Sequence, residues 1–300
     1  MKIRIVASRH TVFYSPLIST MAGGFMEKYG LEYTYGVLAP GETAAGMIRE
    51  GRTDIMQSAP STNWAKMEKG ETGFPMHFAL INRRDGFFLA GRNRNASFTW
   101  KDLERRRLIA DHGSQPLTML RYAARHNGVD WSKVEVIDAG TPEEMMAAFR
   151  EGKGDFVHLQ APGPQLLEEE GKGWIAVSVG DSMPPNAFSS LCASAEFIAG
   201  ETCRIFDRAF AEAKEWVNAT PAEEIAAKQA SHFPGVSQAV LASSIGRYKD
   251  IGAWEGGPEI PRDLYDQSLN VFETVGNIKM RQPYDAVCVF MAPVREARQA

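Results

Sequence analysis

The sequence predicts an α/β protein of two lobes, each built on a mainly parallel sheet that is flanked by helices. Three observations favour this fold class. Short apolar strands alternate with amphipathic helices over the first two thirds of the chain, which is typical of βαβ units. A stretch of this unit occurs twice, and the last third has a helical pattern. The length of 300 residues is sufficient for two separate cores.

The first lobe is expected to begin with two βαβ units. Apolar alternation predicts strands at 3–7, 31–38 and 54–56. One helix should follow the first strand and end at Gly30, and a second should end at Gly51, because glycine is a common helix stop.

The middle of the chain repeats this scheme. Strands are expected at 108–110 and 134–137, with a helix between them. A further helix should begin after Thr141, which is followed by proline and two acidic residues. A threonine cap, a proline in the first turn and acids near the positive end of the helix dipole all favour a helix start.

Internal similarity is the most informative feature of the sequence. Residues 47–56 resemble residues 148–157: each stretch has a helix end, a glycine stop and an aspartate that enters an apolar strand. Both strands then run into an alanine-proline pair, at 59–60 and at 161–162. We interpret the two stretches as the same βαβ unit in two lobes.

The last third of the chain should form helices that pack on the first lobe. Helical patterns cover 203–217, 236–248 and 261–275, and another helix starts after Thr220. The chain is expected to cross between lobes near 87–89 and 187–189. This gives lobe I as residues 1–87 and 188–300, and lobe II as residues 88–187.

Composition limits the function classes. The formal net charge of −4 argues against a general nucleic-acid partner, and no apolar run approaches the roughly 20 residues of a membrane span. The three cysteines are widely spaced and predict neither a disulfide framework nor a zinc site. The first residues have no secretory leader pattern, so a native start at Met1 would favour the cytoplasm.

Ligands of open α/β sheets bind beyond the carboxyl ends of the strands. Several loops at that edge precede helices, whose free N–H groups suit a carboxylate, sulfonate or phosphate. The rule nominates the loops at 8–11, 38–41, 58–61, 111–115, 140–141 and 160–162. The candidate ligand-binding residues on and beside these loops and the second crossing are Arg9, His10, Thr11, Phe13, Tyr14, Ser58, Ser61, Trp64, His112, Ser114, Gln115, Thr141, Gln160 and Asn186.

Several candidates allow two interpretations. Phe13 and Tyr14 can stack on an aromatic ligand or form the first apolar turn of a helix, and we expect one of them to be in the core. Trp64 can wall the cleft or lie in the core. Arg9 can clamp an anion or face solvent, and His112 can close over the ligand or face solvent.

Three further positions depend on where the strands face. His158 and Gln160 alternate on one expected strand and therefore point to the same side. If that side is the cleft, both reach the ligand; if not, at least one needs a buried partner. Asn186 lies beside the second crossing and can donate a hydrogen bond near the hinge. For His10 we favour a role at the cleft floor, because its loop follows the first strand.

The order and spacing of these motifs resemble the nitrate, sulfonate and taurine substrate-binding superfamily, which includes thiamine-pyrimidine binding proteins and synthases. The resemblance covers roughly the first two thirds of the chain. It implies a type 2 periplasmic-binding fold and a cleft that closes on a ligand. The cysteine-rich motif of the pyrimidine synthases is absent. The matching segments are 13–17, 25–31, 51–54, 58–61, 100–103 and 152–155.

The favoured function is therefore a receptor that closes a two-lobed cleft around a small organic anion or heteroaromatic ligand and delivers it to an ABC-type permease. Family members of this kind are usually exported, which implies the periplasm. No cofactor or metal is expected. The alternative is a cytoplasmic lyase or transferase on the same fold, with His10 or His112 as general acid or base. A ligand-responsive regulatory module is a third hypothesis, although no DNA-binding segment is recognisable. No nucleophile elbow or metal-binding histidine motif occurs in the sequence.

Overall fold

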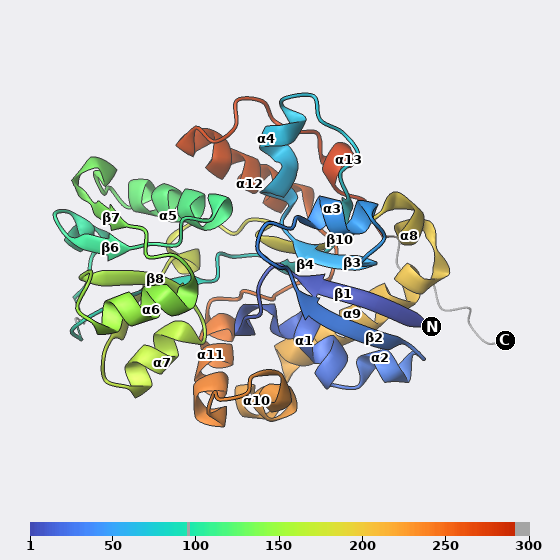
Figure 1. Ribbon diagram of the computed structural model, residues 1–300, viewed down its shortest axis with the longest axis horizontal. Coiled ribbons are helices and arrows are strands. Elements are labelled where there is room, and N and C mark those ends of the chain that lie inside the picture. The colour runs from blue at the N-terminus through green and yellow to red at the C-terminus, as the bar shows by residue number, and fades with distance from the viewer. Residues whose placement is uncertain (95–96, 292–300) are drawn as a thin grey trace.

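The computed structural model describes residues 1–94 and 97–291, whose strands form two five-stranded sheets (Figure 1). The sheet of the first lobe has the order β2-β1-β3-β10-β4, and that of the second has the order β7-β6-β8-β5-β9. The strands of the first sheet are β1 (Lys2–Ala7), β2 (Glu32–Val37), β3 (Ile55–Ser58), β4 (Met76–Asn82) and β10 (Ser189–Ala193). Those of the second are β5 (Phe87–Gly91), β6 (Arg107–Ile109), β7 (Glu135–Ile137), β8 (Phe156–Gln160) and β9 (Trp174–Ser178).

Each sheet combines a parallel set with an antiparallel strand, so the sheets are mixed rather than mainly parallel. In the first sheet β1 is parallel to β2 and β3, whereas β10 is antiparallel to β3 and β4. In the second, β6 is parallel to β7 and β8, whereas β5 is antiparallel to β8 and β9. The reason is connectivity: β5 and β10 arrive from the other lobe, so each begins at the edge where the parallel strands end. The predicted two-lobed α/β class is confirmed.

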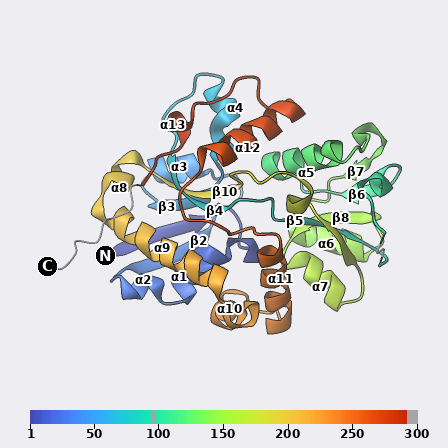
Figure 2. The same cartoon turned by 180° about the vertical axis from the view of Figure 1, so that it is seen from behind.

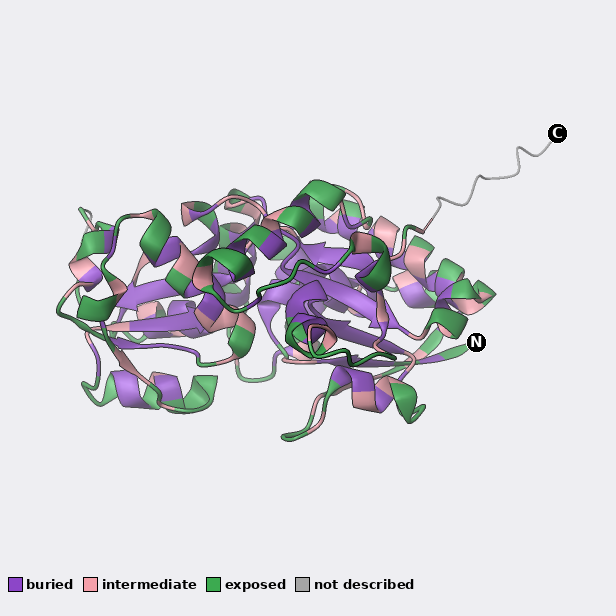
Figure 3. Cartoon of the chain, turned by 90° about the horizontal axis from the view of Figure 1, so that it is seen from above, coloured by how far each residue is buried: buried purple, intermediate pink, exposed green. Residues whose placement is uncertain are grey.

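Helices cover both sheets, and the final third of the described chain is helical, as predicted (Figures 1 and 2). Strands β3, β5 and β10 are buried along their whole length, whereas β2, β7 and β9 are only partly covered, and the outer faces of the helices carry exposed residues (Figure 3). The helices are α1 (Ser15–Ala22), α2 (Phe25–Lys28), α3 (Ala44–Arg49), α4 (Trp64–Met67), α5 (Ser114–His126), α6 (Pro142–Arg150), α7 (Gly163–Glu169), α8 (Ala195–Ala199), α9 (Glu201–Ala219), α10 (Ala222–Gln229), α11 (Gln238–Asp250), α12 (Arg262–Val275) and α13 (Tyr284–Val287).

The expected single helix before Gly30 is two helices, α1 and α2. Gly24 has a φ of +82°, a conformation that only glycine adopts readily, and it ends the helical path. A Cβ on Gly23 would lie 2.6 Å from the Phe25 ring. The pair of glycines therefore lets the chain turn before α2.

Two helices of the C-terminal third also reach the second lobe. α12 packs on α5 and α11 packs on α7 (Figure 1). None of the helices in the described part of the chain is long and apolar enough to cross a membrane.

The chain passes between the sheets twice, at 83–86 and at 179–188, and the two segments are joined by backbone hydrogen bonds. Asn186 N donates to Arg83 O over 2.9 Å, and Val179 N donates to Phe87 O over 3.0 Å. The lobe boundaries at 87/88 and 187/188 stay predictions.

Close packing fixes the geometry of this double crossing. The Phe13 ring lies so close to Gly86 that a Cβ there would overlap it, and a Cβ on Gly180 would overlap the carbonyl oxygen of Asp85. Both glycines are therefore required by close approach of neighbouring groups.

Asp85 is a buried carboxyl group on the first crossing. It is 0 % exposed, and its Oδ1 accepts a hydrogen bond from Phe87 N over 2.6 Å. Its Oδ2 has no hydrogen-bond partner among the described residues. Burial, with a smaller contribution from the nearby Asp111, raises the pKa of Asp85 to about 8 despite the lowering effect of the hydrogen bond from Phe87 N. The folded protein therefore binds a proton here more tightly than the unfolded chain does.

We expect Gly180→Ala to lower the free energy of unfolding by about 1–3 kcal/mol or more, because the added methyl group overlaps the backbone of the other crossing. Urea unfolding checks this. Gly36→Ala is the matched control, since a Cβ on Gly36 meets nothing within 4 Å. Equal stability of the two variants would contradict the packing argument.

We also expect a pH signature from Asp85. Its folded pKa lies above the unfolded value of about 3.9, so its contribution to stability is complete at low pH and is lost as the pH rises towards 8. Asp85→Asn keeps an acceptor for Phe87 N and removes the titration. Between pH 5 and pH 8 the wild type should lose more than about 1 kcal/mol relative to this variant. Asp181→Asn, an exposed carboxyl group on the second crossing, is the control; a wild-type pH slope equal to that of Asp85→Asn would refute the assignment.

Candidate functional site

A large cavity of about 950 Å³ lies between the two sheets. Its walls are the loops that follow β1, β6, β7 and β8, which meet here because the parallel strands of both sheets end at this edge. A loop after α10 completes one wall. The lining residues used below are Arg9, His10, Thr11, Val37, Phe87, Asp111, His112, Thr141, Glu143, Glu144, Met146, His158, Leu159, Gln160, His232 and Phe233.

A second cavity of about 320 Å³ adjoins the first, and Arg9, Phe87 and Gln160 line both. The loop after β3 and the start of α5 form its walls. Many of its lining groups are hydroxyls and amides: Tyr14, Thr43, Gln57, Ser58, Ser61, Thr62, Ser114 and Gln115. Ser61 is 7 % exposed, and its Oγ has no hydrogen-bond partner among the described residues.

An ion pair joins the two lobes between these cavities. Arg9 follows β1, and its Nη1 and Nη2 both donate to the carboxylate of Asp111, which follows β6; the Nη2–Oδ1 distance is 3.1 Å. Burial raises the pKa of Asp111, but the hydrogen bonds from Arg9 and Gly113 N outweigh it and hold the pKa below its usual value. Burial likewise lowers the pKa of Arg9, and Asp111 reverses that effect. Both side chains are therefore charged, and each neutralises the other.

His10 lines the large cavity, but both of its ring nitrogens have partners in the protein. Nε2 lies 2.6 Å from the carbonyl oxygen of His232, and Nδ1 lies 3.0 Å from the Tyr35 hydroxyl. A carbonyl only accepts, so Nε2 donates, and in the neutral ring Nδ1 accepts from Tyr35. The ring also stacks on Phe233 with centroids 4.6 Å apart. His10 thus fixes the loop after α10 to the first strand loop.

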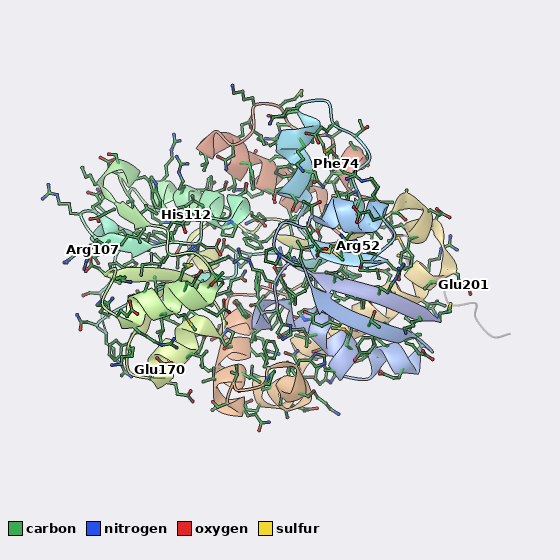
Figure 4. The ribbon with its side chains drawn as sticks, in the orientation of Figure 1. Arg52, Phe74, Arg107, His112, Glu170 and Glu201 are labelled. Carbon is green, nitrogen blue, oxygen red and sulfur yellow. The ribbon has the colours of Figure 1, made fainter. Side chains whose placement is uncertain are left out.

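Three polar residues of the second lobe line the same cavity. His112 lies in the half of the molecule that contains α5, and its Nδ1 donates to Ala110 O over 2.8 Å (Figure 4). Thr141 caps α6 by accepting from Glu144 N. Gln160 stands at the end of β8.

Thr11 also lines this cavity, although its hydroxyl is used inside the protein, where it donates to Ala161 O over 2.7 Å. In the smaller cavity, Gln115 Nε2 donates to Phe188 O over 2.8 Å.

Three candidates lie away from both cavities. Phe13 is 0 % exposed and packs against Phe188 and Tyr248 beneath the crossing. Trp64 is 0 % exposed and makes edge contacts with aromatic rings of α12. Asn186 is buried between the crossing segments. These placements correct the expected ligand contacts. The rings of Phe13 and Trp64 are buried in the core, and the amide of Asn186 is buried at the crossing. Of the pair Phe13 and Tyr14, Tyr14 is the one that reaches a cavity wall.

The structure adds residues that the sequence analysis did not select. His158 lines the large cavity beside Gln160, as strand alternation allowed, and Phe87 stacks against it with ring centroids 4.2 Å apart. Asp111 is the partner of Arg9. Phe233 comes from the loop after α10, which no strand precedes, so the rule of strand ends could not identify it.

The three cysteines are buried and unpaired, and none lines either cavity among the described residues. Burial raises the pKa of Cys203 to about 12, so its thiol is protonated at neutral pH. No cluster of three or more metal-ligating side chains occurs in the part of the chain that the structure describes.

Two sheets joined by a double crossing, with a cavity at their facing strand ends, define a protein of the periplasmic-binding class. The chain matches the NMT1-like family over residues 8–231 and belongs to it. The predicted resemblance to substrate-binding proteins is thereby confirmed.

Individual relatives are distant. YtlA of Bacillus subtilis (strain 168), to which a binding role is assigned by inference, is 23% identical over 288 residues, which cover 95% of this chain and 86% of YtlA. A ligand-binding component of an ABC-type import system from Staphylococcus aureus has a TM-score of 0.74 at 15% identity and covers 96% of both chains. The alkanesulfonate-binding protein SsuA from Xanthomonas axonopodis pv. citri, bound to MOPS, has a TM-score of 0.73 at 12% identity, with 97% of this chain and 98% of SsuA covered. At these identities the structures establish a shared fold.

The ion pair between the lobes should be measurable. Arg9→Met leaves the largely buried Asp111 carboxylate without its counter-charge, and we expect a loss of about 1–3 kcal/mol in the free energy of unfolding at pH 7. Because the folded pKa of Asp111 is depressed, this loss should vanish as the pH falls through that value.

Arg262→Met is the matched control, because Arg262 pairs with Asp285 on the exposed surface. Urea unfolding of both variants at pH 7 and pH 3 gives the comparison. A loss for Arg9→Met that is the same at both pH values would show that packing, not charge, is responsible.

Proposed function

We propose that the protein is a solute receptor that binds a small organic molecule between its two lobes and presents it to an ABC-type permease. The observation that carries this proposal is the 950 Å³ cavity at the facing strand ends, with walls from both lobes. Such a volume suits a small organic ligand, and the strand-end position is where this class of sheet binds ligands. The family match and the fold shared with an ABC import component support the partner.

Closure is part of the proposal. Lobe I (1–87 and 188–300) and lobe II (88–187) would move about the hydrogen-bonded double crossing, with a ligand favouring the closed form. The Arg9–Asp111 pair would act as a contact between lobes that forms when they approach. The packing of α12 on α5 and of α11 on α7 would limit the size of the motion.

No feature of the cavity favours the enzyme alternative. Both nitrogens of His10 are engaged within the protein, so it is poorly placed to exchange a proton with a ligand. His112 keeps Nε2 available, but none of the described lining residues forms a nucleophile–base pair with it.

The decisive measurement is a thermal-shift screen of carboxylates, sulfonates, amides and pyrimidines, after native mass spectrometry of the gently purified protein. A true ligand should raise the melting temperature, since binding to the folded state stabilises it, and should be recovered chemically unchanged after incubation. Small-angle scattering with and without that ligand then tests closure. A bound compound that is converted to product would refute the receptor function. His112 would then be the first candidate for a general acid or base.

A further inference from the structure

The wall of the large cavity contains a buried imidazole without a hydrogen-bond partner among the described residues. His158 on β8 is 0 % exposed, and neither Nδ1 nor Nε2 has a hydrogen-bond partner among the described residues. Its ring stacks on Phe87 at an interplanar angle of 24°, which holds the imidazole at the cavity wall. Buried polar groups are nearly always paired, and leaving one unpaired costs free energy. A ligand in the cavity would supply the missing partner.

The protonation state of His158 determines what kind of partner fits. Burial lowers its pKa to about 3, so the ring is neutral at pH 7. A neutral imidazole has one donor nitrogen and one acceptor nitrogen. A ligand edge with an N–H next to an oxygen can pair with either tautomer, whereas a carboxylate or sulfonate offers acceptors alone.

The charges around the cavity also disfavour an anion. The guanidinium group of Arg9 is already held by both oxygens of Asp111. The remaining carboxylates of the described lining are Glu143 and Glu144 in the first turn of α6. Apart from Arg9, the described lining contains no lysine or arginine that could neutralise them. A ligand with free negative charge would face these acids without a free counter-charge.

Two aromatic side chains, Phe87 and Phe233, line the cavity. Phe87, against which His158 stacks, is the first residue of β5, and Phe233, which stacks on His10, comes from the loop after α10. Met146 and Leu159 add apolar surface to the same lining. A planar ring is the shape that aromatic and apolar walls of this kind accommodate.

Building on the proposed receptor function, we propose that the large cavity takes a planar aromatic ligand that bears an amide-type donor–acceptor edge and no net negative charge, and that His158 is the residue that recognises this edge. His158 is thereby a specificity-determining residue, which distinguishes this protein from a receptor for free sulfonates.

Matched ring compounds test the ligand class. We would measure dissociation constants by ligand-observed NMR for benzamide, nicotinamide, benzoate, nicotinate and benzenesulfonate. The two amides should bind. The three anions should have dissociation constants at least roughly tenfold higher, which is the effect of about one hydrogen bond or one unbalanced charge. Tighter binding of an anion than of its amide, or no binding of either amide, would overturn the proposal.

Two substitutions of His158 separate recognition from structure. His158→Phe keeps a ring against Phe87 and removes both nitrogens, so stability should stay equal or rise while amide affinity falls roughly tenfold. His158→Gln restores a donor and an acceptor and should recover part of that affinity. A His158→Phe variant that unfolds more easily than the wild type, or that binds the amides as well, would show that the imidazole serves the fold.

Removal of the Asp111 charge tests the argument that the cavity disfavours anionic ligands. Asp111→Asn releases Arg9 from its ion pair, so benzenesulfonate should bind roughly tenfold more tightly while benzamide changes little. Asp285→Asn removes the carboxylate of an exposed pair far from the cavity and is the matched control. Unchanged benzenesulfonate affinity in Asp111→Asn would overturn the charge argument.

These results are distinct from a failure of the receptor function itself. If only anions bind and are recovered unchanged, the receptor function stands and the ligand class falls. If an amide binds and is chemically converted, the ligand class stands and the receptor function falls.

Discussion

The double crossing between the lobes is the constraint on which the rest of the structure depends. Because β5 and β10 each enter a sheet from the other lobe, they begin where the parallel strands end, and both sets of strand ends are turned towards one another. The crossing segments are paired through backbone hydrogen bonds, so neither can shift alone. Phe13, which lies just before α1, packs against Gly86 of the first crossing segment. This connectivity brings the strand-end loops of both sheets together, and those loops form the walls of the cavity.

The arrangement also explains how polar and charged groups are distributed along the cleft. Arg9 and Asp111 are 102 residues apart in sequence, yet each follows a parallel strand that ends at the same edge, so they meet. Their pairing removes the only arginine from competition for ligands among the described lining residues of the large cavity. What remains in the described lining is a set of aromatic rings, acidic side chains and histidines. The smaller cavity differs, since hydroxyl and amide groups form much of its lining.

Periodicity and glycine stops predicted the two-lobed class, the parallel strands β1–β3 and β6–β8, and the strand-end loops of the cavity, because these depend on local patterns and on one general rule of sheet topology; β4 and β9 were not predicted. Chemistry at individual positions was harder to predict. Phe13, Tyr14 and Trp64 follow strand loops, and no local pattern tells whether such a ring faces the core or the cleft. The loop that carries Phe233 follows a helix and reaches the cavity through tertiary packing alone. The antiparallel direction of β5 and β10 follows from the crossings and not from any local sequence pattern.

His10 and His158 show why a histidine in a cleft must be judged by its partners. Both line the same cavity, and sequence reasoning favoured His10, because its loop follows the first strand. In the structure the Tyr35 hydroxyl and the His232 carbonyl occupy both nitrogens of His10, which makes it a joint between two loops. Within the described part of the chain His158 has no such partners, although it is the more deeply buried of the two, and burial without a partner is the costlier state. In the proposed binding mode a ligand supplies the missing partner, so recognition in this cleft depends on His158 and not on His10, whose nitrogens are already engaged.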